Sequence, residues 1–174
     1  MATYIKIASN TVGAGGAASV TFSSIPSTYT DLVMKISSRQ NADTNGVMLS
    51  FTFNGNATNY SRRNIYTDGS GIAVLSGSSE TLSRFAFSDS STFTANTFTN
   101  AELYIPNYTS SYAKSVSSDG AAENNATLGY LSLSANLWNP ASQAAINSIG
   151  VSISSGGSSF VQYSTFTLYG ISNA

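Results

Sequence analysis

The sequence contains neither cysteine nor histidine. Without cysteine the chain has no disulfide framework and no thiolate for a metal, and without histidine it lacks the commonest metal ligand and general base. Its serines therefore have no histidine partner for nucleophilic catalysis, and no Gly-x-Ser-x-Gly motif occurs. We expect a protein with no metal, no cofactor and no enzymatic activity. A two-carboxylate glycosidase is the enzymatic alternative, because its acids need only meet in space.

Charge is also scarce. Charged residues make up 9% of the chain, against a usual share of about a quarter, whereas 41% of the residues are apolar. The net charge is -1 and the longest basic run is the pair Arg62 and Arg63, which disfavours a nucleic-acid partner. Hydroxyl and amide groups must cover most of the surface. Such a surface suits close packing against copies of the chain or against other proteins.

No apolar run approaches the roughly 18 residues of a membrane helix, and the N-terminus lacks the basic and apolar regions of a secretory leader. We therefore expect no membrane partner and synthesis in the cytoplasm. A length of 174 residues predicts one domain, residues 1–174.

Apolar residues recur with a period of two, which is typical of half-buried strands. The strongest internal run contains Leu49 and Phe51, and Asn54-Gly55, a preferred hairpin turn, follows it. We also predict a closing hairpin over residues 146–171, with its turn at Gly156-Gly157. The core positions that we predict are Leu32, Met34, Ile36, Leu49, Phe51, Leu103, Ile105, Val151, Ile153, Phe166 and Leu168.

About a dozen short strands separated by turn signals, without intervening helices, predict an all-β fold. Two packed antiparallel sheets, a β-sandwich, are favoured over a parallel α/β fold. Among sandwiches we prefer the jelly roll, because the strands are too many and the chain too long for an immunoglobulin-like domain.

Residues 41–46 imitate the first half of a calcium loop, with oxygen-bearing side chains at alternate positions before a glycine. The position of the bidentate glutamate is occupied by Thr52, inside a predicted strand, so we interpret this segment as a plain turn.

Arginines and tyrosines supply the candidate interface. In a strand, Arg62 and Arg63 point to opposite faces, so we expect one to be solvated and the other to pair with a carboxylate or a neighbouring subunit. Tyrosine and arginine are enriched at protein interfaces. The candidate interface residues are Tyr60, Arg62, Arg63, Tyr66, Tyr108 and Tyr112. We expect Trp138, which precedes Asn139-Pro140, to cap the core.

Five segments together resemble small virion proteins of tailed bacteriophages, especially those of marine and cyanobacterial hosts. These segments are residues 4–7, 24–32, 59–63, 102–108 and 160–171. They are strand and turn signatures, and the resemblance extends over nearly the whole chain.

The resemblance implies a non-enzymatic structural protein of the virion, made in the host cytoplasm. A capsid decoration protein is preferred, and a tail-fibre or receptor-binding module that recognises a host surface glycan is the alternative. The implied partners are the chain itself, as a homo-oligomer with a trimer preferred, and the major capsid protein or other virion proteins.

Overall fold

The computed structural model describes residues 2–44, 47–124, 128–142, 144–154 and 158–172, and none of these residues is helical. The all-β prediction is confirmed. The strands are β1 (Thr3–Thr11), β2 (Ser19–Phe22), β3 (Asp31–Ser38), β4 (Met48–Phe53), β5 (Tyr60–Thr67), β6 (Ile72–Glu80), β7 (Ser83–Phe87), β8 (Thr99–Ile105), β9 (Lys114–Asn124), β10 (Leu128–Trp138), β11 (Ile149–Ile153) and β12 (Thr165–Ser172).

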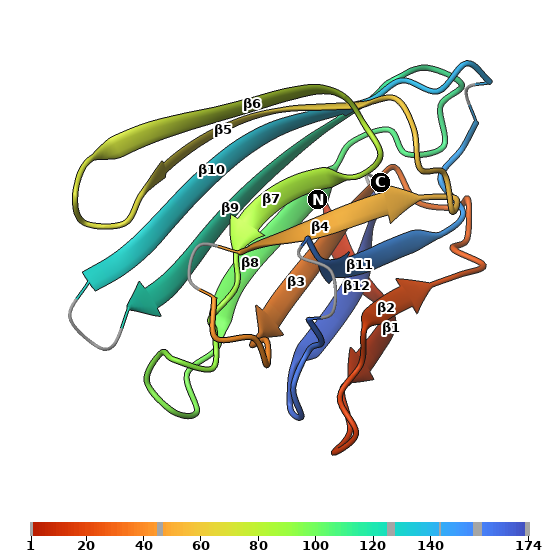
Figure 1. Cartoon of the computed structure of the whole chain (residues 1–174). Coiled ribbons are helices and arrows are strands. Elements are labelled where there is room, and N and C mark those ends of the chain that lie inside the picture. The colour runs from red at the N-terminus through yellow and green to blue at the C-terminus, as the bar shows by residue number, and fades with distance from the viewer. Residues whose placement is uncertain (1, 45–46, 125–127, 143, 155–157, 173–174) are drawn as a thin grey trace.

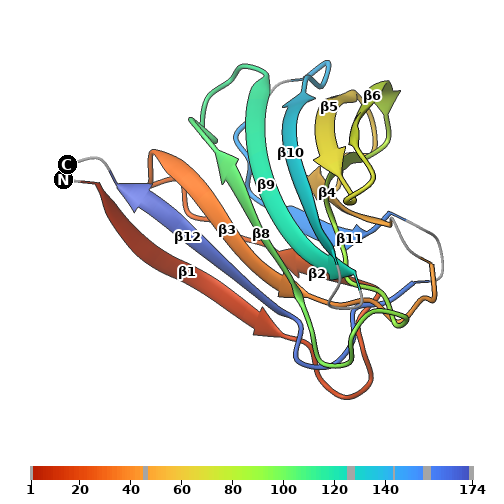
Figure 2. The ribbon, with the colours of Figure 1, turned by 90° about the vertical axis from the view of Figure 1, so that its left-hand side faces the viewer.

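Two antiparallel sheets pack face to face, which confirms the predicted β-sandwich (Figure 1). The large sheet has eight strands in the order β1-β12-β3-β8-β9-β10-β5-β6, and the small sheet has four in the order β2-β11-β4-β7. The chain begins and ends in neighbouring strands, since Thr3 pairs with Ser172 (Figure 2).

The chain alternates between the sheets for most of its length. The connections β1 to β2, β2 to β3, β3 to β4, β7 to β8 and β11 to β12 each cross from one sheet to the other. Two antiparallel hairpins, β5-β6 and β9-β10, both belong to the large sheet and lie beyond β8. We call these four strands the extension of the large sheet.

The core lies between the sheets, and all the core positions predicted from the sequence are buried in it. At one end an aromatic cluster closes it. Trp138 and Tyr60 stack with their ring centroids 6.2 Å apart, and Phe53 packs edge-on against Trp138. The expected position of Trp138 at the border of the core is thus confirmed, with 2% of the residue exposed.

Both predicted hairpins are wrong. Asn54 and Gly55 have the positive φ angles, 53° and 65°, of the expected turn, yet β4 belongs to the small sheet and β5 to the large one. The Asn54 side chain bonds away from the expected hairpin: its Oδ1 accepts hydrogen bonds from the backbone of Asn147 and Ser148, which ties the turn to the start of β11.

In the predicted closing hairpin, β11 and β12 likewise lie in opposite sheets. β11 pairs with β2 and β4, whereas β12 pairs with β1 and β3. Phe160 precedes β12 and bridges to Ala17 and Gln40. Gly156-Gly157, the predicted turn, lies outside the described residues.

The two sheets approach each other closely where β7 packs against the extension. A Cβ atom on Gly120 of β9 would lie 2.7 Å from Cβ of Ala86 on β7 and 3.1 Å from Oγ of Ser132 on β10. Only small side chains fit in such a gap. The inner face of the extension therefore carries glycine and serine where a sandwich usually carries large apolar residues.

Candidate interaction surface on the large sheet

The extension of the large sheet turns its aliphatic side chains outward. Along β10, Ser132, Ser134 and Asn136 are buried against the small sheet, while the alternating leucines face away from it. The outer face collects six large exposed aliphatic residues, which we call the aliphatic surface: Ile65 (54% exposed), Ile72 (82%), Val74 (73%), Leu131 (49%), Leu133 (49%) and Leu137 (37%).

Strand register makes the aliphatic surface continuous. Leu133 on β10 lies opposite Ile65 on β5, and Ile65 lies opposite Val74 on β6, so one apolar row crosses three strands. Directly opposed side chains in neighbouring strands touch. The largest apolar patch on a monomer commonly covers about 300–600 Å² and is often functional. A row of this kind on a solvent-facing sheet is therefore a candidate interaction surface.

A polar network beneath this face holds β5, β6 and β7 together. Arg62 Nε donates to Glu80 Oε2 at 2.9 Å, and Arg62 Nη1 donates to Asn64 Oδ1 at 2.9 Å. Glu80 Oε1 also accepts a hydrogen bond from Arg84 Nη1 at 2.8 Å. The expectation that one of the two adjacent arginines pairs with a carboxylate is confirmed, and the ion pair fixes β6 to the sheet.

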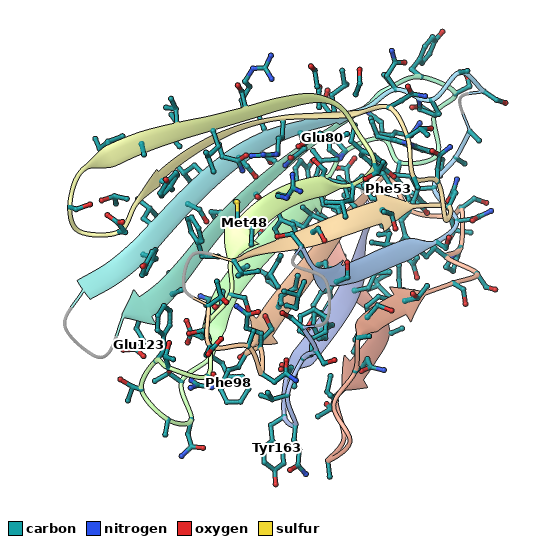
Figure 3. The ribbon with its side chains drawn as sticks, viewed as in Figure 1. Met48, Phe53, Glu80, Phe98, Glu123 and Tyr163 are labelled. Carbon is teal, nitrogen blue, oxygen red and sulfur yellow. The ribbon has the colours of Figure 1, made fainter. Side chains whose placement is uncertain are left out.

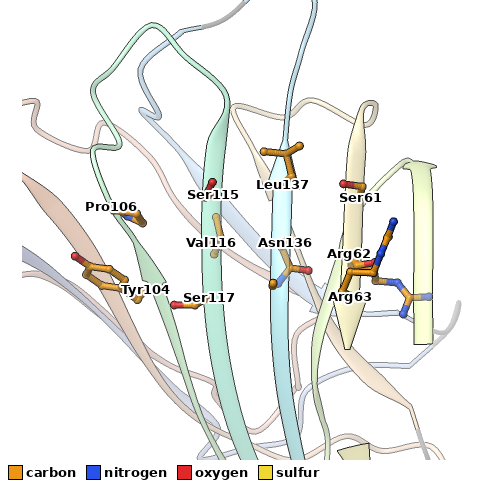
Figure 4. A pocket seen from close by; sticks show the side chains of 11 residues that line it. Ser61, Arg62, Arg63, Tyr104, Pro106, Ser115, Val116, Ser117, Asn136 and Leu137 are labelled. Carbon is orange, nitrogen blue, oxygen red and sulfur yellow. The ribbon is translucent and has the colours of Figure 1, made fainter. Parts of the chain in front are cut away.

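A shallow groove of about 540 Å³ adjoins the aliphatic surface (Figure 4). It crosses the sheet from Tyr104 and Pro106 to Arg63, passing over the serines of β9 and over Leu137. The Tyr104 hydroxyl donates to Asp31 Oδ2 at 2.8 Å, and this bond to a carboxylate raises the pKa of Tyr104. Arg63 points outward, opposite to Arg62, as expected from strand geometry.

The six candidate interface residues do not form one surface. Tyr60 and Tyr108 are completely buried and Arg62 is 9% exposed, so these three belong to the interior. Burial raises the pKa of Tyr60 to about 12. The expectation that these three lie at an interface is corrected. Alternation along β5 places Tyr60 and Arg62 on the inward face, and Tyr108, in the loop after β8, is buried with its hydroxyl donating to the carbonyl of Pro26.

The other three candidates lie apart from one another. Tyr66 packs edge-on against Phe87 with ring centroids 5.1 Å apart, on the inner side of the extension. Tyr112 is 75% exposed in the loop before β9, and Arg63 is on the outer face. Of the six, only Arg63 borders the aliphatic surface. The alternation of residues in β10 predicts a strand. The only sequence signal that bears on which way its leucines face is the set of serines and asparagine between them.

A second groove, of about 320 Å³, lies among loops at the end of the molecule that holds Tyr163 and Phe98 (Figure 3). Tyr163 is 67% exposed and has a φ of 71°, although a tyrosine rarely adopts the left-handed conformation. The backbone N–H of Ser164 donates to the carbonyl of Val161, so Tyr163 occupies the third position of a tight turn, where glycine is usual. Backbone strain of this kind is typical of functional sites.

Arg39 and Asp89 organise the loop between β7 and β8. The buried Arg39 guanidinium donates to the carbonyl oxygens of Ser91, Phe93, Thr94 and Thr97 at 2.7 to 3.3 Å. Asp89 is completely buried; its Oδ1 accepts a hydrogen bond from the Thr99 hydroxyl at 3.2 Å, whereas its Oδ2 accepts none from the described residues. Burial raises the pKa of the Asp89 carboxyl, and the nearby Glu123 adds to the effect.

The described part of the sequence contains no group of three or more carboxylate, cysteine or histidine side chains placed to hold a metal ion. In the segment that imitates a calcium loop, Asn41 Oδ1 accepts a hydrogen bond from the backbone of Ser159 at 2.8 Å, and residues 45 and 46 lie outside the described residues. Within the described ranges, no helix is long and apolar enough to cross a membrane.

Comparison with known proteins adds no relative. No protein-family model matches the chain, and no curated protein and no solved structure is significantly similar to it.

Proposed function

We propose that the protein is a non-enzymatic structural protein of a tailed-bacteriophage virion and that it decorates the surface of the capsid. It is made in the host cytoplasm and acts on the particle. Its partners are further copies of itself, for which the resemblance favours a trimer, and the major capsid protein or other virion proteins. Neither a nucleic acid nor a membrane is among them.

The strand order is the observation that carries this proposal. The set β1-β12-β3-β8 faces the set β2-β11-β4-β7, and the chain passes back and forth between the two sets. Eight strands in two sheets joined in this way are what a jelly roll requires, and viral capsid domains and lectins use that fold. We infer a jelly roll whose first sheet is extended by the two inserted hairpins.

The surface supports attachment to a particle. Fifteen charged residues are few for a chain of this length, and the outer face of the extension carries the aliphatic surface. Interface cores are depleted of charge, and an exposed apolar patch of this size is a liability unless it is covered. Both properties suit a protein that spends its working life bound to neighbours.

The carboxylates support the non-enzymatic part of the proposal. Asp31 binds Tyr104 and the backbone of Asn107, and Glu80 binds two arginines. Asp89 and Glu123 lie near each other, but Asp89 is completely buried and cannot reach a substrate, while Glu123 accepts hydrogen bonds from Thr94. These four acids stabilise loops and strands, and Glu102, which lies opposite Asp119 in the strand register, is paired with Lys35.

Immunogold electron microscopy of purified particles tests the location. An antibody against the chain should label the heads of intact virions over their whole surface. Labelling confined to the tail tip would favour a tail-fibre or receptor-binding module. Unlabelled particles from a lysate that contains the protein would overturn the virion assignment. A second antibody, against the major capsid protein, controls for accessibility.

The alternative is a tail-fibre or receptor-binding module that recognises a host surface glycan. The specific observation in its favour is the groove beside Tyr163, because an exposed aromatic ring held in a strained turn offers a sugar a flat apolar face. Asn96 and Gln162, which also line this groove, carry amides that suit sugar hydroxyls.

A further inference from the structure

Two charged side chains on the strands of the extension lie next to the aliphatic surface, and they have opposite signs. Arg63 is two residues along β5 from Ile65, and Asp119 of β9 lies opposite Leu133 in the strand register. Both point outward, because their neighbours along the strand are buried. The two charges therefore border the aliphatic surface on opposite sides of β10.

Asp119 lacks a counter-charge. Its neighbour on β8 is Glu102, directly opposite in the strand register, and like charges in this arrangement destabilise a sheet. Lys35 pairs with Glu102. Within the described part of the chain, neither Asp119 nor Arg63 takes part in an ion pair, and Arg63 donates to backbone carbonyl oxygens. An arginine that approached Asp119 from outside the sheet would supply the missing charge.

The exposed area is the right size for an interface core. Six aliphatic residues at the exposed fractions given above present on the order of 600 Å² of apolar surface, the upper end for a single patch on a monomer. A stable protein interface buries about 800 Å² on each partner, with its most apolar part at the centre. Together with the polar side chains around it, the aliphatic surface comes close to that value. Packing against another sheet, face to face, would cover it.

We propose that a second copy of this chain packs face to face on the aliphatic surface, with Arg63 of each copy paired with Asp119 of the other. A twofold axis that lies between the two faces, and crosses β10 obliquely between Leu133 and Ala135, exchanges the positions of these two side chains. Each copy then supplies one arginine and one carboxylate to two equivalent ion pairs. Because the contact is isologous, it closes on itself and does not grow into filaments.

The same axis brings the apolar side chains of the two copies together. With neighbouring strands about 4.8 Å apart and a rise of about 3.4 Å per residue, it places Val74 over Leu131 of the second copy. Ile65 and Leu133 lie within about 2 Å of the axis at these spacings, so they face the same two residues of the second copy. The two charges alone define the axis, and the overlap of the apolar residues follows without further adjustment.

A copy of the chain is selected as the occupant because the surface is complementary to itself. A different partner would need an apolar face of similar size, with a carboxylate to meet Arg63 and a cation to meet Asp119. A twofold contact yields a dimer, whereas the resemblance to phage proteins favours a trimer. The inference rests on this face and not on the proposed function, so a dimer in solution stands whether or not the protein is found in virions.

Charge reversal tests the pairing, with light scattering coupled to size-exclusion chromatography over a hundredfold range of concentration. The wild-type chain should have the mass of a dimer. Arg63→Asp and Asp119→Arg each place like charges opposite one another, and each should raise the dissociation constant of the dimer by about a hundredfold or more. The chain that carries both changes regains opposite charges and should again be a dimer. A double variant that stays monomeric would contradict this pairing.

Two further variants locate the contact on the extension. Val74→Lys should be a monomer with an unchanged circular dichroism spectrum, because a lysine held against Leu131 of the second copy would be buried without a partner. Lys6→Asp reverses an exposed charge on β1, at the other edge of the large sheet, and should remain a dimer.

Nuclear Overhauser effects in a mixture of isotope-labelled and unlabelled wild-type chain provide a second readout, which does not depend on the folding of a variant. Methyl contacts between copies should connect Val74 with Leu131. A monomer at all concentrations, an oligomer that the single charge reversals leave intact, or contacts between copies at another face would each overturn the proposal. A monomer that binds isolated capsids through Val74 would overturn it too, and would assign the surface to the capsid protein.

Discussion

Arg62 Nε and Glu80 Oε2 lie 2.9 Å apart, and the two side chains are 10% and 17% exposed. This ion pair joins β5 to β6, and Glu80 binds Arg84 as well. Replacing Glu80 by Gln leaves the Arg62 guanidinium partly buried without a counter-charge. We expect Glu80→Gln to lower the free energy of unfolding by about 2 to 4 kcal/mol, measured by urea denaturation.

The Lys35–Glu102 pair on the outer face of the large sheet is the matched control, because the Lys35 side chain is 55% exposed. Glu102→Gln should cost less than about 1 kcal/mol. Equal losses in the two variants would mean that the Arg62–Glu80 pair contributes no more than an ordinary surface contact.

Phe51 and Phe166 are the test of the core, one from each sheet, with 1% and 0% exposed. Phe51 packs against Phe53 with ring centroids 4.8 Å apart, and Phe166 packs against Phe160 at the same distance. Truncation to alanine should cost about 3 to 5 kcal/mol at either position, measured by chemical denaturation. A loss below about 1 kcal/mol would place that residue outside the core. Tyr4→Ala, at an exposed site, should have a small effect.

Asp89 makes stability depend on pH. Burial raises its pKa above the ordinary value, so the folded chain binds this proton more tightly than the unfolded chain. The stabilisation is fully present below the ordinary pKa of aspartate and is lost as pH rises through the raised pKa. Asp89→Asn carries no such proton, so we expect it to be more stable than the wild type at pH 7, with the difference shrinking as pH falls.

Asp68 is the control of opposite sign. The Ser70 side chain and backbone donate hydrogen bonds to this exposed carboxylate and lower its pKa. Its contribution is therefore present above the ordinary pKa and lost on acidification. Urea denaturation between pH 3 and pH 8 compares Asp89→Asn and Asp68→Asn with the wild type. A parallel pH profile for Asp89→Asn and the wild type would show that Asp89 ionises in the folded chain as freely as in water.

Replacing Tyr163 distinguishes the cost of its backbone strain from a role of its ring in binding. In Tyr163→Gly the left-handed strain of about 1 to 2 kcal/mol is relieved, and the added entropy of the unfolded chain offsets about half of it. We expect the variant to be slightly more stable by thermal denaturation. If the groove binds sugars, the same change should abolish binding to host surface polysaccharide, whereas Tyr112→Ala, an exposed aromatic elsewhere, should leave it intact. Binding that survives the loss of the Tyr163 ring would remove this groove from the account.

Local patterns predicted the strands well. Leu49 and Phe51 alternate with polar residues in the sequence, and on β4 they point into the core between the sheets, because side chains of a strand alternate between its two faces. The strand that each one pairs with depends on residues far away in the sequence. Asn54-Gly55 dictates the backbone of a turn, but Asn54 bonds to the chain at 147 and 148, beside β11, and β5 continues in the large sheet.

The aliphatic surface marks a second limit of sequence reasoning. In β10 the leucines alternate with serines, and either set satisfies the period of a strand. Close approach of Ala86 to Gly120 excludes the leucines from the inner face, and that approach involves residues far apart in the sequence. Tyr60 and Tyr108, expected at an interface, are likewise buried against residues far away in the sequence: Tyr60 stacks on Trp138, and the Tyr108 hydroxyl donates to the carbonyl of Pro26.

The copy number of the chain in purified virions, measured by quantitative mass spectrometry against the major capsid protein, tests the proposed function most directly. A capsid decoration protein should be present in hundreds of copies per particle. A few dozen copies at most would move the protein to the tail, and its absence from particles that contain every other virion protein would contradict the structural role.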